Sequence, residues 1–406
     1  MATRRLLVAL AALLAVAALL VAWAAPAPAT AQATSVHLAL GNPSGAAPDP
    51  TRLENFLIVR DQYALGYRCG DGIALWASWR LVAGDLGDED RGDFRQDTSL
   101  PPGCYVVRDA DYVGSGYNRG HLVPSADRTA TEADNRATFL FTNALPQSPN
   151  NNGGPWLDME NLGRELAIAG DEVYTVAGPE GELGRLPAPG GPLRIPARTW
   201  RALLAVPASP GDPAERVTTA TRLTAISVPN DKDDPSVRRS DDWELYATSV
   251  DAIEAATGLD LFGDLHPKIQ RVLEARIDLG ARPYTIAVNG TASLTATVGA
   301  VFAPLRAWVR GPGGEPIPGV VVAFAALGDA ANASLGGDVV AMATTDAAGV
   351  ATVAAVAGPV AGSYIVEASI AGVYEPAVFE LTNVPSQGAL QPVIFLPMVS
   401  YAASDN

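Results

Sequence analysis

The sequence has few residues of the types that bind soft metals or act as thiol nucleophiles, with two cysteines and three histidines among 406 residues. The two cysteines, Cys69 and Cys104, lie about 35 residues apart. Zinc sites built from sulfur ligands need closely spaced cysteines, so the wide spacing of this pair argues against a zinc site. A catalytic thiol is less favoured still. A single disulfide is the simplest interpretation, and in an exported chain it would stabilise the fold by roughly 3 to 4 kcal/mol.

Long hydrophobic runs are also scarce, because only one stretch approaches the length that spans a membrane. It lies in residues 1–31, begins after two arginines and ends in the small-residue sequence ATA. This order is typical of a cleaved secretory signal, and two prolines before the end favour cleavage. The alternative is a retained membrane anchor, since an apolar run of about 18 residues is near spanning length. We expect cleavage, no stable membrane insertion afterwards, and a secreted, extracellular or cell-surface protein.

Basic residues are outnumbered, with 28 lysines and arginines against 44 aspartates and glutamates and a net charge of −16. Residues 32–282 carry −12 of this charge and residues 283–406 carry −6. The excess of acidic residues in both halves argues against a protein that binds polyanions on a broad basic surface. Any contact with nucleic acid would therefore need a local cluster of arginines and a bound cation.

Length and composition predict a globular protein of two domains, because 48% hydrophobic and 18% charged residues disfavour wholesale disorder. Residues 32–282 mix strand and helix patterns, which predicts an α+β domain with a central antiparallel sheet. From residue 283, alanine, valine, glycine and threonine dominate and short strands alternate with glycine or proline turns. This predicts a β-sandwich over residues 283–384, followed by a tail over 385–406.

Several elements of the first domain can be predicted individually. We expect a short strand near residues 33–40 and two strands separated by the turn CGDG at residues 69–72, with Trp76 and Trp79 on opposite faces of the second. Thr131 is a plausible helix cap, and a second helix, with Leu157, Leu162, Leu166 and Ile168 at roughly helical spacing, should end at Gly170. Further helices are expected in VDAIEAATG, after a strand in YATSVDAIE, and around residues 267–277. Both tryptophans are expected in the core, although stacking on nucleobases is the alternative.

The stretch GYNRGHLVPSADR, residues 116–128, brings Arg119 and His121 to the same side of an extended segment. Further on, Asn152 and Glu160 are eight residues apart at the start of a predicted helix. Eight residues turn by about 800°, which returns the two side chains to within about 80° of each other. The sequence thus predicts that one imidazole, one guanidinium, one amide and one carboxylate converge.

This set of groups suits the hydrolysis of a phosphodiester. The reaction needs a base for water, positive charge for the developing phosphorane and a divalent cation for the departing oxygen. Histidine suits the base because its ordinary pKa lies near neutrality. Magnesium keeps most of its water, so one amide ligand and a carboxylate that holds a metal-bound water are sufficient.

The combination resembles the DNA/RNA non-specific endonuclease family with the ββα-metal active site, which includes secreted bacterial nucleases and endonuclease G. The family motif Asp-Arg-Gly-His appears here as residues 118–121, with Asn118 in place of the aspartate. TNALPQ and NNNGGPW followed by Glu160 continue the match, and the resemblance spans about residues 50–275. The replacement at Asn118 removes a charge that could pair with Arg119, but the base and the metal ligand remain.

The resemblance implies a role for each matching residue. His121 would be the general base, Asn152 the direct ligand of Mg²⁺ or Mn²⁺, and Glu160 would orient metal-bound water. Arg119 and an upstream arginine would contact the phosphate; Arg91 is the favoured candidate, with Arg95 close enough in sequence to be the alternative. Asn143 would hold the site in place through backbone contacts to the base, or be a simple turn residue. DNA and RNA would be the substrates.

Other interpretations remain open. Part of the second domain, TTDAAGVATVAAVAGPVAGSYIVEASIAG, resembles bacterial immunoglobulin-like domains of the invasin type, in which a Thr-Asp-x-x-Gly turn precedes two paired strands. Such a domain could bind a cell-surface or polymer partner, so a catalytically inactive adhesion protein on a nuclease-like fold is one alternative. A phosphodiesterase for small diesters is another. Finally, the acidic loop NDKDDP, residues 230–235, could bind a second cation or be a solvated loop.

Overall fold

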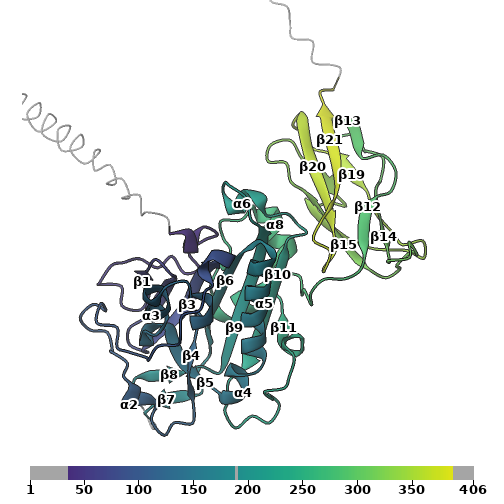
Figure 1. The fold of residues 1–406 in the computed structure, drawn as a ribbon. Helices are drawn as coiled ribbons and strands as arrows, with labels where there is room; N and C mark the ends of the chain where they lie inside the picture. The colour runs from purple at the N-terminus through teal and green to yellow at the C-terminus, as the bar shows by residue number, and fades with distance from the viewer. Residues whose placement is uncertain (1–34, 188–190, 387–406) are drawn as a thin grey trace, which may run out of the picture. The chain divides into compact units, whose positions relative to one another are not determined.

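The computed structural model describes residues 35–187 and 191–386 (Figure 1). The predicted signal at residues 1–31 and nearly all of the predicted tail at 385–406 lie outside these ranges. Among the described residues, no helix is both long and apolar enough to cross a membrane. We refer to residues 35–282 as the first region and to residues 283–386 as the C-terminal region.

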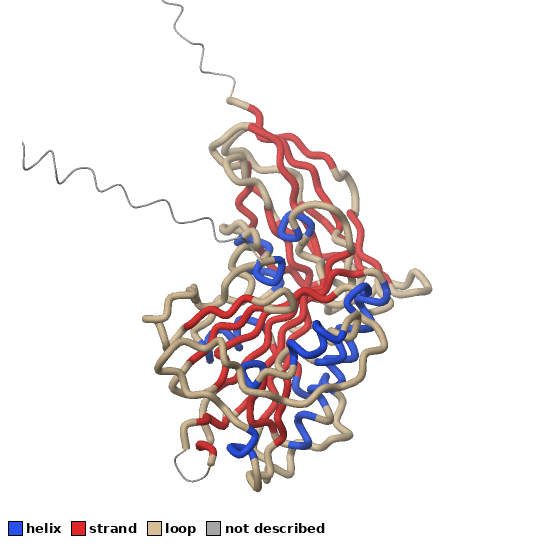
Figure 2. Tube along the Cα trace, turned by 60° about the vertical axis from the view of Figure 1, so that its left-hand side comes forward, coloured by secondary structure: helices blue, strands red, loops and turns tan. Residues whose placement is uncertain are grey.

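The first region is built on a seven-stranded sheet in which every pairing is antiparallel. Its strands in spatial order are β1 (Phe56–Val59), β2 (Ala64–Arg68), β3 (Ile73–Leu81), β6 (Asp171–Glu180), β9 (Arg198–Pro207), β10 (Arg222–Pro229) and β11 (Ala247–Thr248). Figure 2 shows these strands crossing the middle of the region, with helical segments beside them. The predicted α+β class with a central antiparallel sheet is confirmed.

The two faces of the sheet carry separate hydrophobic cores. One core contains Trp79 together with apolar residues of α5 (Pro155–Ala169), and the other contains Trp76 together with residues of α7 (Val250–Thr257) and α8 (Pro267–Leu273). The two indoles therefore lie on opposite faces, as predicted, and both are fully buried. Neither ring is available to stack on a nucleobase.

Shorter elements connect the strands. They are η1 (Val36–Leu38), η2 (Ala83–Asp85), α2 (Asp109–Tyr112), β4 (Asn118–His121), η3 (Ser125–Asp127), α3 (Glu132–Thr138), η4 (Phe141–Asn143), β5 (Ala144–Gln147), α4 (Pro149–Asn152), β7 (Gly184–Leu186), β8 (Leu193–Ile195), α6 (Pro213–Arg216) and η5 (Trp243–Tyr246). Strands β4 and β5 form a two-stranded sheet of their own, and so do β7 and β8.

The local signals at helix ends and at the cysteines are confirmed. The Thr131 hydroxyl accepts a hydrogen bond from the Asp134 amide at the start of α3. Gly170 ends α5 in the left-handed conformation, with φ of 108°. The disulfide between Cys69 and Cys104 is present. These features depend on residues close in sequence or on a pairing with no competing cysteine, so the sequence was sufficient to predict them.

Other local predictions need correction. Residues 36–38 form a 3₁₀ turn rather than a strand, because the His37 side chain bonds to Asp61 O and to the Arg80 amide and so ties the segment to the sheet edge. The segment before the CGDG turn contains two strands, β1 and β2, instead of one. The strand predicted in YATSVDAIE has only two residues, since the Ser249 hydroxyl caps α7 immediately afterwards.

The apolar face of α5 also differs from the predicted one. Of the four aliphatic residues at the predicted spacing, Leu162 and Leu166 pack against the core, whereas Leu157 and Ile168 are 37% and 68% exposed. The buried side chains are Trp156, Met159 and Ala167, which follow the spacing of three and four residues that defines one helix face. Residue size and position relative to the sheet, rather than aliphatic character alone, decide which face is covered.

The C-terminal region is all β. Its strands are β12 (Thr285–Val288), β13 (Ser293–Thr297), β14 (Leu305–Arg310), β15 (Val321–Ala326), β16 (Ala333–Leu335), β17 (Val340–Thr344), β18 (Val350–Val353), β19 (Ala355–Ala357), β20 (Gly362–Ser369) and β21 (Ala377–Val384). They form sheets of order β12-β14-β18 and β13-β21-β20-β15-β17, with a β16-β19 pair. One hydrophobic core takes residues from both larger sheets, including Leu305 and Phe324. Its immunoglobulin-like character stays a prediction.

The predicted Thr-Asp-x-x-Gly turn is present between β17 and β18. The Asp346 carboxylate accepts hydrogen bonds from the amides of Ala348 and Val350, and Gly349 has a φ of 72°. The strands that follow this turn are not paired with each other, however. Strand β18 pairs with β14, whereas β20 pairs with β15 and β21, so the two strands belong to different sheets.

Candidate active site

The candidate base lies on β4, which pairs with β5 so that Gly120 faces Leu145 and His121 faces Ala144. A side chain at position 120 has no room, because a Cβ atom there would lie 2.1 Å from Oε1 of Gln147. Gln147 also donates from Nε2 to the Asn151 side chain. The glycine of the Arg-Gly-His motif and the glutamine of TNALPQ therefore fit together, and the pair connects β4 to α4.

The His121 side chain is buried and contacts two phenylalanine rings. Its ring centroid lies 4.6 Å from that of Phe94 and 4.9 Å from that of Phe139, and Trp156 donates an indole hydrogen bond to the His121 carbonyl. Burial, followed by the charge of Arg91, lowers the pKa of His121 to about 3. The imidazole is therefore neutral at pH 7, and its Nε2 has no hydrogen-bond partner among the described residues.

Asn143 holds the backbone that follows the histidine. Its side-chain oxygen accepts from the Val123 amide, and its Nδ2 donates to the carbonyls of Val123 and Thr138. Its own carbonyl accepts from the Leu122 amide. All of these groups are buried, so Asn143 fixes the chain immediately after His121 without itself reaching a solvent-exposed position.

Asn152 and Glu160 do not share one helix, contrary to the prediction. Asn152 ends α4, and α5 begins at Pro155 after two glycines. Gly154 allows this break, because a Cβ atom there would lie 2.7 Å from the Asn150 carbonyl oxygen. The estimate of about 80° between the two side chains on a continuous helix therefore does not apply.

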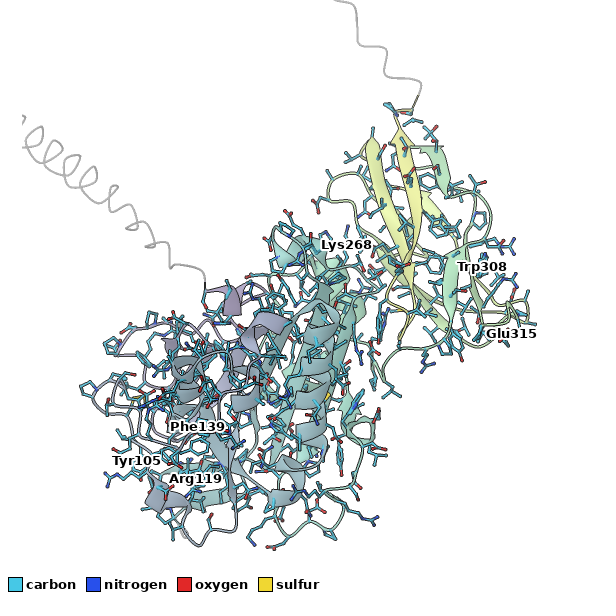
Figure 3. All side chains as sticks on the ribbon, in the orientation of Figure 1. Tyr105, Arg119, Phe139, Lys268, Trp308 and Glu315 are labelled. Carbon is cyan, nitrogen blue, oxygen red and sulfur yellow. A yellow bond between two sulfur atoms is a disulfide. The ribbon has the colours of Figure 1, made fainter. Side chains whose placement is uncertain are left out.

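A cleft of about 670 Å³ opens beside β4. Its walls carry three of the predicted residues, Arg91, Arg119 and Asn152, together with Asn118, Phe94 and Phe139. Figure 3 shows Arg119 and Phe139 in the same part of the first region. Neither His121 nor Glu160 is among the lining residues. The rings of Phe94 and Phe139, which do line the cleft, both contact the His121 ring.

Arg91 and Arg95, the two candidates for the upstream phosphate contact, occupy different positions. Arg91 lines the same cleft as Arg119, and its guanidinium lies 5.6 Å from the centre of the Phe139 ring. Arg95 lines other surface pockets and donates to the Arg136 carbonyl. Arg119 forms an ion pair with Asp109, so it has an acidic partner even though Asn118 replaces the aspartate of the motif.

Glu160 contacts a buried arginine that the sequence did not single out. Its Oε1 lies 3.4 Å from a guanidinium nitrogen of Arg201, and the same Arg201 nitrogen donates to the Leu122 carbonyl, one residue after His121. Burial raises the pKa of Glu160 to about 7, although the Arg201 charge acts in the opposite direction. Glu160 is thus linked to the strand of the base through Arg201, while the described contacts do not join it to Asn152.

Arg201 could have been found from one sequence signal. Arg198 begins the strand RTWRALLAVP, and Arg201 is the one charge within its hydrophobic interior; it is fully buried there, with its guanidinium 4.3 Å from the centre of the Trp156 ring. A buried charge is costly unless it is paired, so such a residue usually holds another charged group in place. Phe94 and Phe139 gave no comparable signal, because aromatic residues are common in any core.

The donor set of the cleft suits a hard cation. The Asn152 side chain lies in the cleft wall and forms no hydrogen bond with another described residue, so its amide oxygen is available. The cleft lining offers oxygen atoms but neither thiols nor imidazoles, a set that favours Mg²⁺, Ca²⁺ or Mn²⁺ over softer metals. The acidic loop at residues 230–235 has no such arrangement: Asp233 pairs with Lys232, and Asp231 and Asp234 accept from amides of their own turn.

Comparisons with known proteins identify the family of this chain. Residues 41–267 match the family model described as DNA/RNA non-specific endonuclease. A nuclease of Nostoc sp. is 45% identical over 245 residues, which cover 60% of this chain and 86% of that protein. A Syncephalastrum racemosum nuclease is 35% identical over 37% of this chain and 46% of its own length. Human mitochondrial endonuclease G is 35% identical over 30% of this chain and 41% of its own length.

A solved structure of an EndoG/EndoGI complex contains a chain that aligns with a TM-score of 0.46 and 20% identity, over 57% of this chain and 92% of that chain. The assignment depends on the sequence matches, which include more than half of the chain and the motif residues of β4 and α4. The protein is therefore an endonuclease of the DNA/RNA non-specific endonuclease family.

Proposed function

We propose that this endonuclease hydrolyses phosphodiester bonds in both DNA and RNA without sequence specificity, with His121 as the general base. Family membership establishes an endonuclease that acts on nucleic acids and depends on a divalent metal. The observation that carries the finer proposal is the unpartnered Nε2 of His121, whose ring contacts Phe94 and Phe139 in the wall of the cleft that also holds Arg91, Arg119 and Asn152.

In the proposed reaction, Nε2 of His121 accepts a proton from water, and the water oxygen then bonds to phosphorus as one P–O ester bond breaks. Because Nε2 is buried, the proposal requires that water gain access to it, and Phe94 and Phe139, which contact the imidazole and line the cleft, are proposed to move for this step. Hydrogen bonds and contacts on the backbone around His121, from Trp156 and Asn143, keep the ring oriented during that movement.

Substrate binding is proposed to depend on the phosphate backbone. Arg91 and Arg119 place two guanidinium groups in the cleft, where they can contact phosphate oxygens and stabilise the charge that develops on them. Contacts to the backbone carry no direct sequence information, which supports action without sequence specificity. The net charge of −16 implies weak, salt-sensitive binding.

The cation is proposed to be Mg²⁺, or Mn²⁺ in its place, held by the Asn152 amide oxygen. Such an ion would neutralise charge on the phosphate and on the departing oxygen. Glu160 and Arg201 are proposed as positioning residues, since they form a buried ion pair that also holds the Leu122 carbonyl.

Export from the cell is a further part of the proposal. Its support is the order of basic, apolar and small residues in positions 1–31 and the disulfide between Cys69 and Cys104, because disulfides persist in oxidising compartments. Mass spectrometry of the protein recovered from a bacterial host would show a mature chain that begins near residue 32. Recovery of only the full-length, membrane-bound chain would contradict export in this form.

The central experiment is digestion of plasmid DNA and of RNA, with and without a chelator, by the wild type and by His121→Ala. We expect the chelator to abolish cleavage of both substrates, and His121→Ala to lower kcat by about 10²- to 10⁴-fold, the range for loss of a general base. His266→Ala is the matched control. His266 is partly exposed, bonds to Asp329 and does not line the cleft.

Three results would each remove part of the proposal. Wild-type turnover by a folded His121→Ala protein would remove the base assignment. Cleavage of only DNA or only RNA would contradict the proposal that the enzyme acts on both sugars. Faster turnover of a small chromogenic diester than of long DNA would instead favour the phosphodiesterase alternative.

A further inference from the structure

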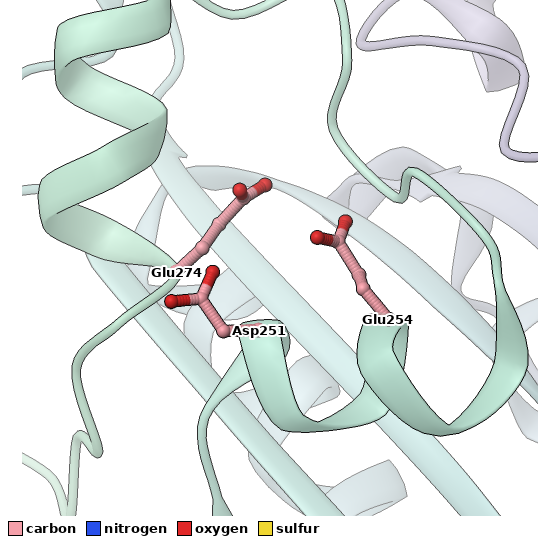
Figure 4. A group of neighbouring side chains, drawn as sticks. All are labelled: Asp251, Glu254 and Glu274. Carbon is pink, nitrogen blue, oxygen red and sulfur yellow. The ribbon is translucent and has the colours of Figure 1, made fainter.

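A group of three carboxylates lies on the opposite face of the sheet from the cleft. Asp251 and Glu254 are three residues apart on α7, and Glu274 follows α8. One carboxylate oxygen from each residue lies within 4.8 Å of the other two. Figure 4 shows the three side chains directed toward one another from the two helices.

Glu274 is the unusual member of the group. It is only 4% exposed, and its Oε1 is buried without any hydrogen-bond partner among the described residues. Polar atoms buried in this way are rare, because leaving water without gaining a partner costs free energy. The side chain is nevertheless directed at two further carboxylates, and the hydrogen bond that favours its ionised form comes from the neutral Gln270 side chain, so the arrangement favours a positively charged ligand or a proton.

The surrounding charges give no compensation. None of the three carboxylates forms an ion pair with a described lysine, arginine or histidine, and the charges that act on Glu274 come from Glu254, Asp251 and Asp260. In the absence of an ion, burial and then Glu254 raise the pKa of Glu274 to about 8. Every neighbouring charge on this side of the site thus disfavours an ionised Glu274, whereas a cation would favour it.

We propose that Asp251, Glu254 and Glu274 bind a divalent cation, Ca²⁺, at a site separate from the catalytic cleft. All three ligands are hard carboxylate oxygens, which Ca²⁺ and Mg²⁺ prefer. The three oxygens lie within 4.8 Å of one another, close enough to approach one ion together. Ca²⁺ is the favoured ion because it accepts irregular coordination by several carboxylates, whereas Mg²⁺ demands near-octahedral geometry and keeps most of its water.

The ion would tie α7 to the end of α8. The Asp251 amide already donates to the Glu274 carbonyl, and the Glu254 side chain accepts from the Leu261 amide, so two of the ligands are held before an ion enters. Asp251 is exposed and Glu254 is partly exposed, which leaves a path from solvent to the buried Glu274. Because both helices pack on the core around Trp76, the ion would stabilise that face of the sheet.

The experiment uses the full chain with Asn152→Ala in every sample, so that an ion in the catalytic cleft contributes as little as possible. CaCl₂ is titrated calorimetrically, and thermal unfolding is followed with and without 10 mM CaCl₂. We expect one binding site and a rise in Tm of roughly 3 to 10 °C. Adding Glu274→Gln should abolish both Ca²⁺ binding and the rise in Tm. Adding Asp251→Asn, at an exposed ligand, should weaken Ca²⁺ binding at least tenfold.

Two controls make the result specific to the site. Glu215→Gln makes the same chemical change at an exposed glutamate of α6 and should leave Ca²⁺ binding unchanged. KCl at matched ionic strength tests whether the gain in Tm reflects only screening of repulsion among the carboxylates.

An equal gain with KCl, or undiminished Ca²⁺ binding by the folded Glu274→Gln protein, would overturn the site. The absence of any Ca²⁺ effect would likewise overturn it. Because the measured quantities are heat of binding and Tm, these outcomes do not depend on whether the proposed catalytic mechanism is correct.

Discussion

The two regions of the chain bury very different kinds of side chain. In the first region the buried polar residues include several ionisable groups, among them His37, Asp97, His121, Arg201 and Glu274. In the C-terminal region the buried polar residues are Thr345, Glu367, Ser369 and Asn383, and its main core consists of aliphatic and aromatic side chains. Both regions nevertheless have extensive hydrophobic cores.

This difference indicates that the first region carries the chemistry and that the C-terminal region serves mainly as a scaffold. A buried ionisable group lowers stability unless it is paired, and perturbed groups of this kind concentrate at functional sites. His121, the Glu160–Arg201 pair and Glu274 all lie in the first region, and the C-terminal region contains neither histidine nor cysteine. Substitutions in the two regions should therefore separate activity from stability, and the following predictions test that separation.

The largest expected effect is on the stability of the C-terminal region. Phe324 is fully buried in its core, so Phe324→Ala should lower the free energy of unfolding by about 3 to 5 kcal/mol. Denaturant unfolding would measure this loss, with Met342→Ala as a control because Met342 is 53% exposed. Nuclease turnover at low temperature should be unchanged. A loss of turnover comparable to that of His121→Ala would show that the two regions are not functionally separate.

A second, smaller effect distinguishes two arginines of the first region. Arg91→Ala should lower kcat/KM roughly 10- to 100-fold, as expected for the loss of a charge-assisted contact to phosphate. Arg95→Ala should change kcat/KM little, because Arg95 lines other pockets and donates to the Arg136 carbonyl. Steady-state kinetics on plasmid DNA would compare them. Equal losses in both variants would mean that the whole loop, rather than the cleft alone, contacts the substrate.

The smallest predicted effect concerns the pH dependence of stability. The folded protein has a pKa of about 3 for His121, below the ordinary value of 6.5, so only the unfolded chain gains a proton there between these values. Stability that is present above pH 6.5 is therefore lost as the pH falls, on the order of 2 kcal/mol between pH 8 and pH 5. His121→Asn should remove this loss.

The measurement compares unfolding free energies of the wild type and His121→Asn at each pH. Glu160 and Glu274, whose pKa values are raised, act in the opposite direction but equally in both proteins. They therefore cancel in the difference. A difference that does not change with pH would show that His121 titrates alike in the folded and unfolded chains.

Much of the architecture could be predicted because it depends on local or pairwise patterns. The alternation in β3 placed Trp76 and Trp79 on opposite faces, and a hydroxyl and a glycine marked ends of α3 and α5. The motif residues included Arg119 and Asn152, which line one cleft, and His121, whose role in the site stays a prediction. Each of these inferences needs only the period of a strand, a cap or a short spacing.

The sequence by itself determined the α+β and all-β regions, the disulfide and the residues that carry the family motif. Only the tertiary structure showed that Gly153 and Gly154 separate Asn152 from the helix of Glu160, that Arg91 rather than Arg95 lines the cleft, and that Arg201 pairs with Glu160. It also brought Glu274 beside α7. The physical reason is that these relations depend on packing between segments distant in sequence, which no local period encodes.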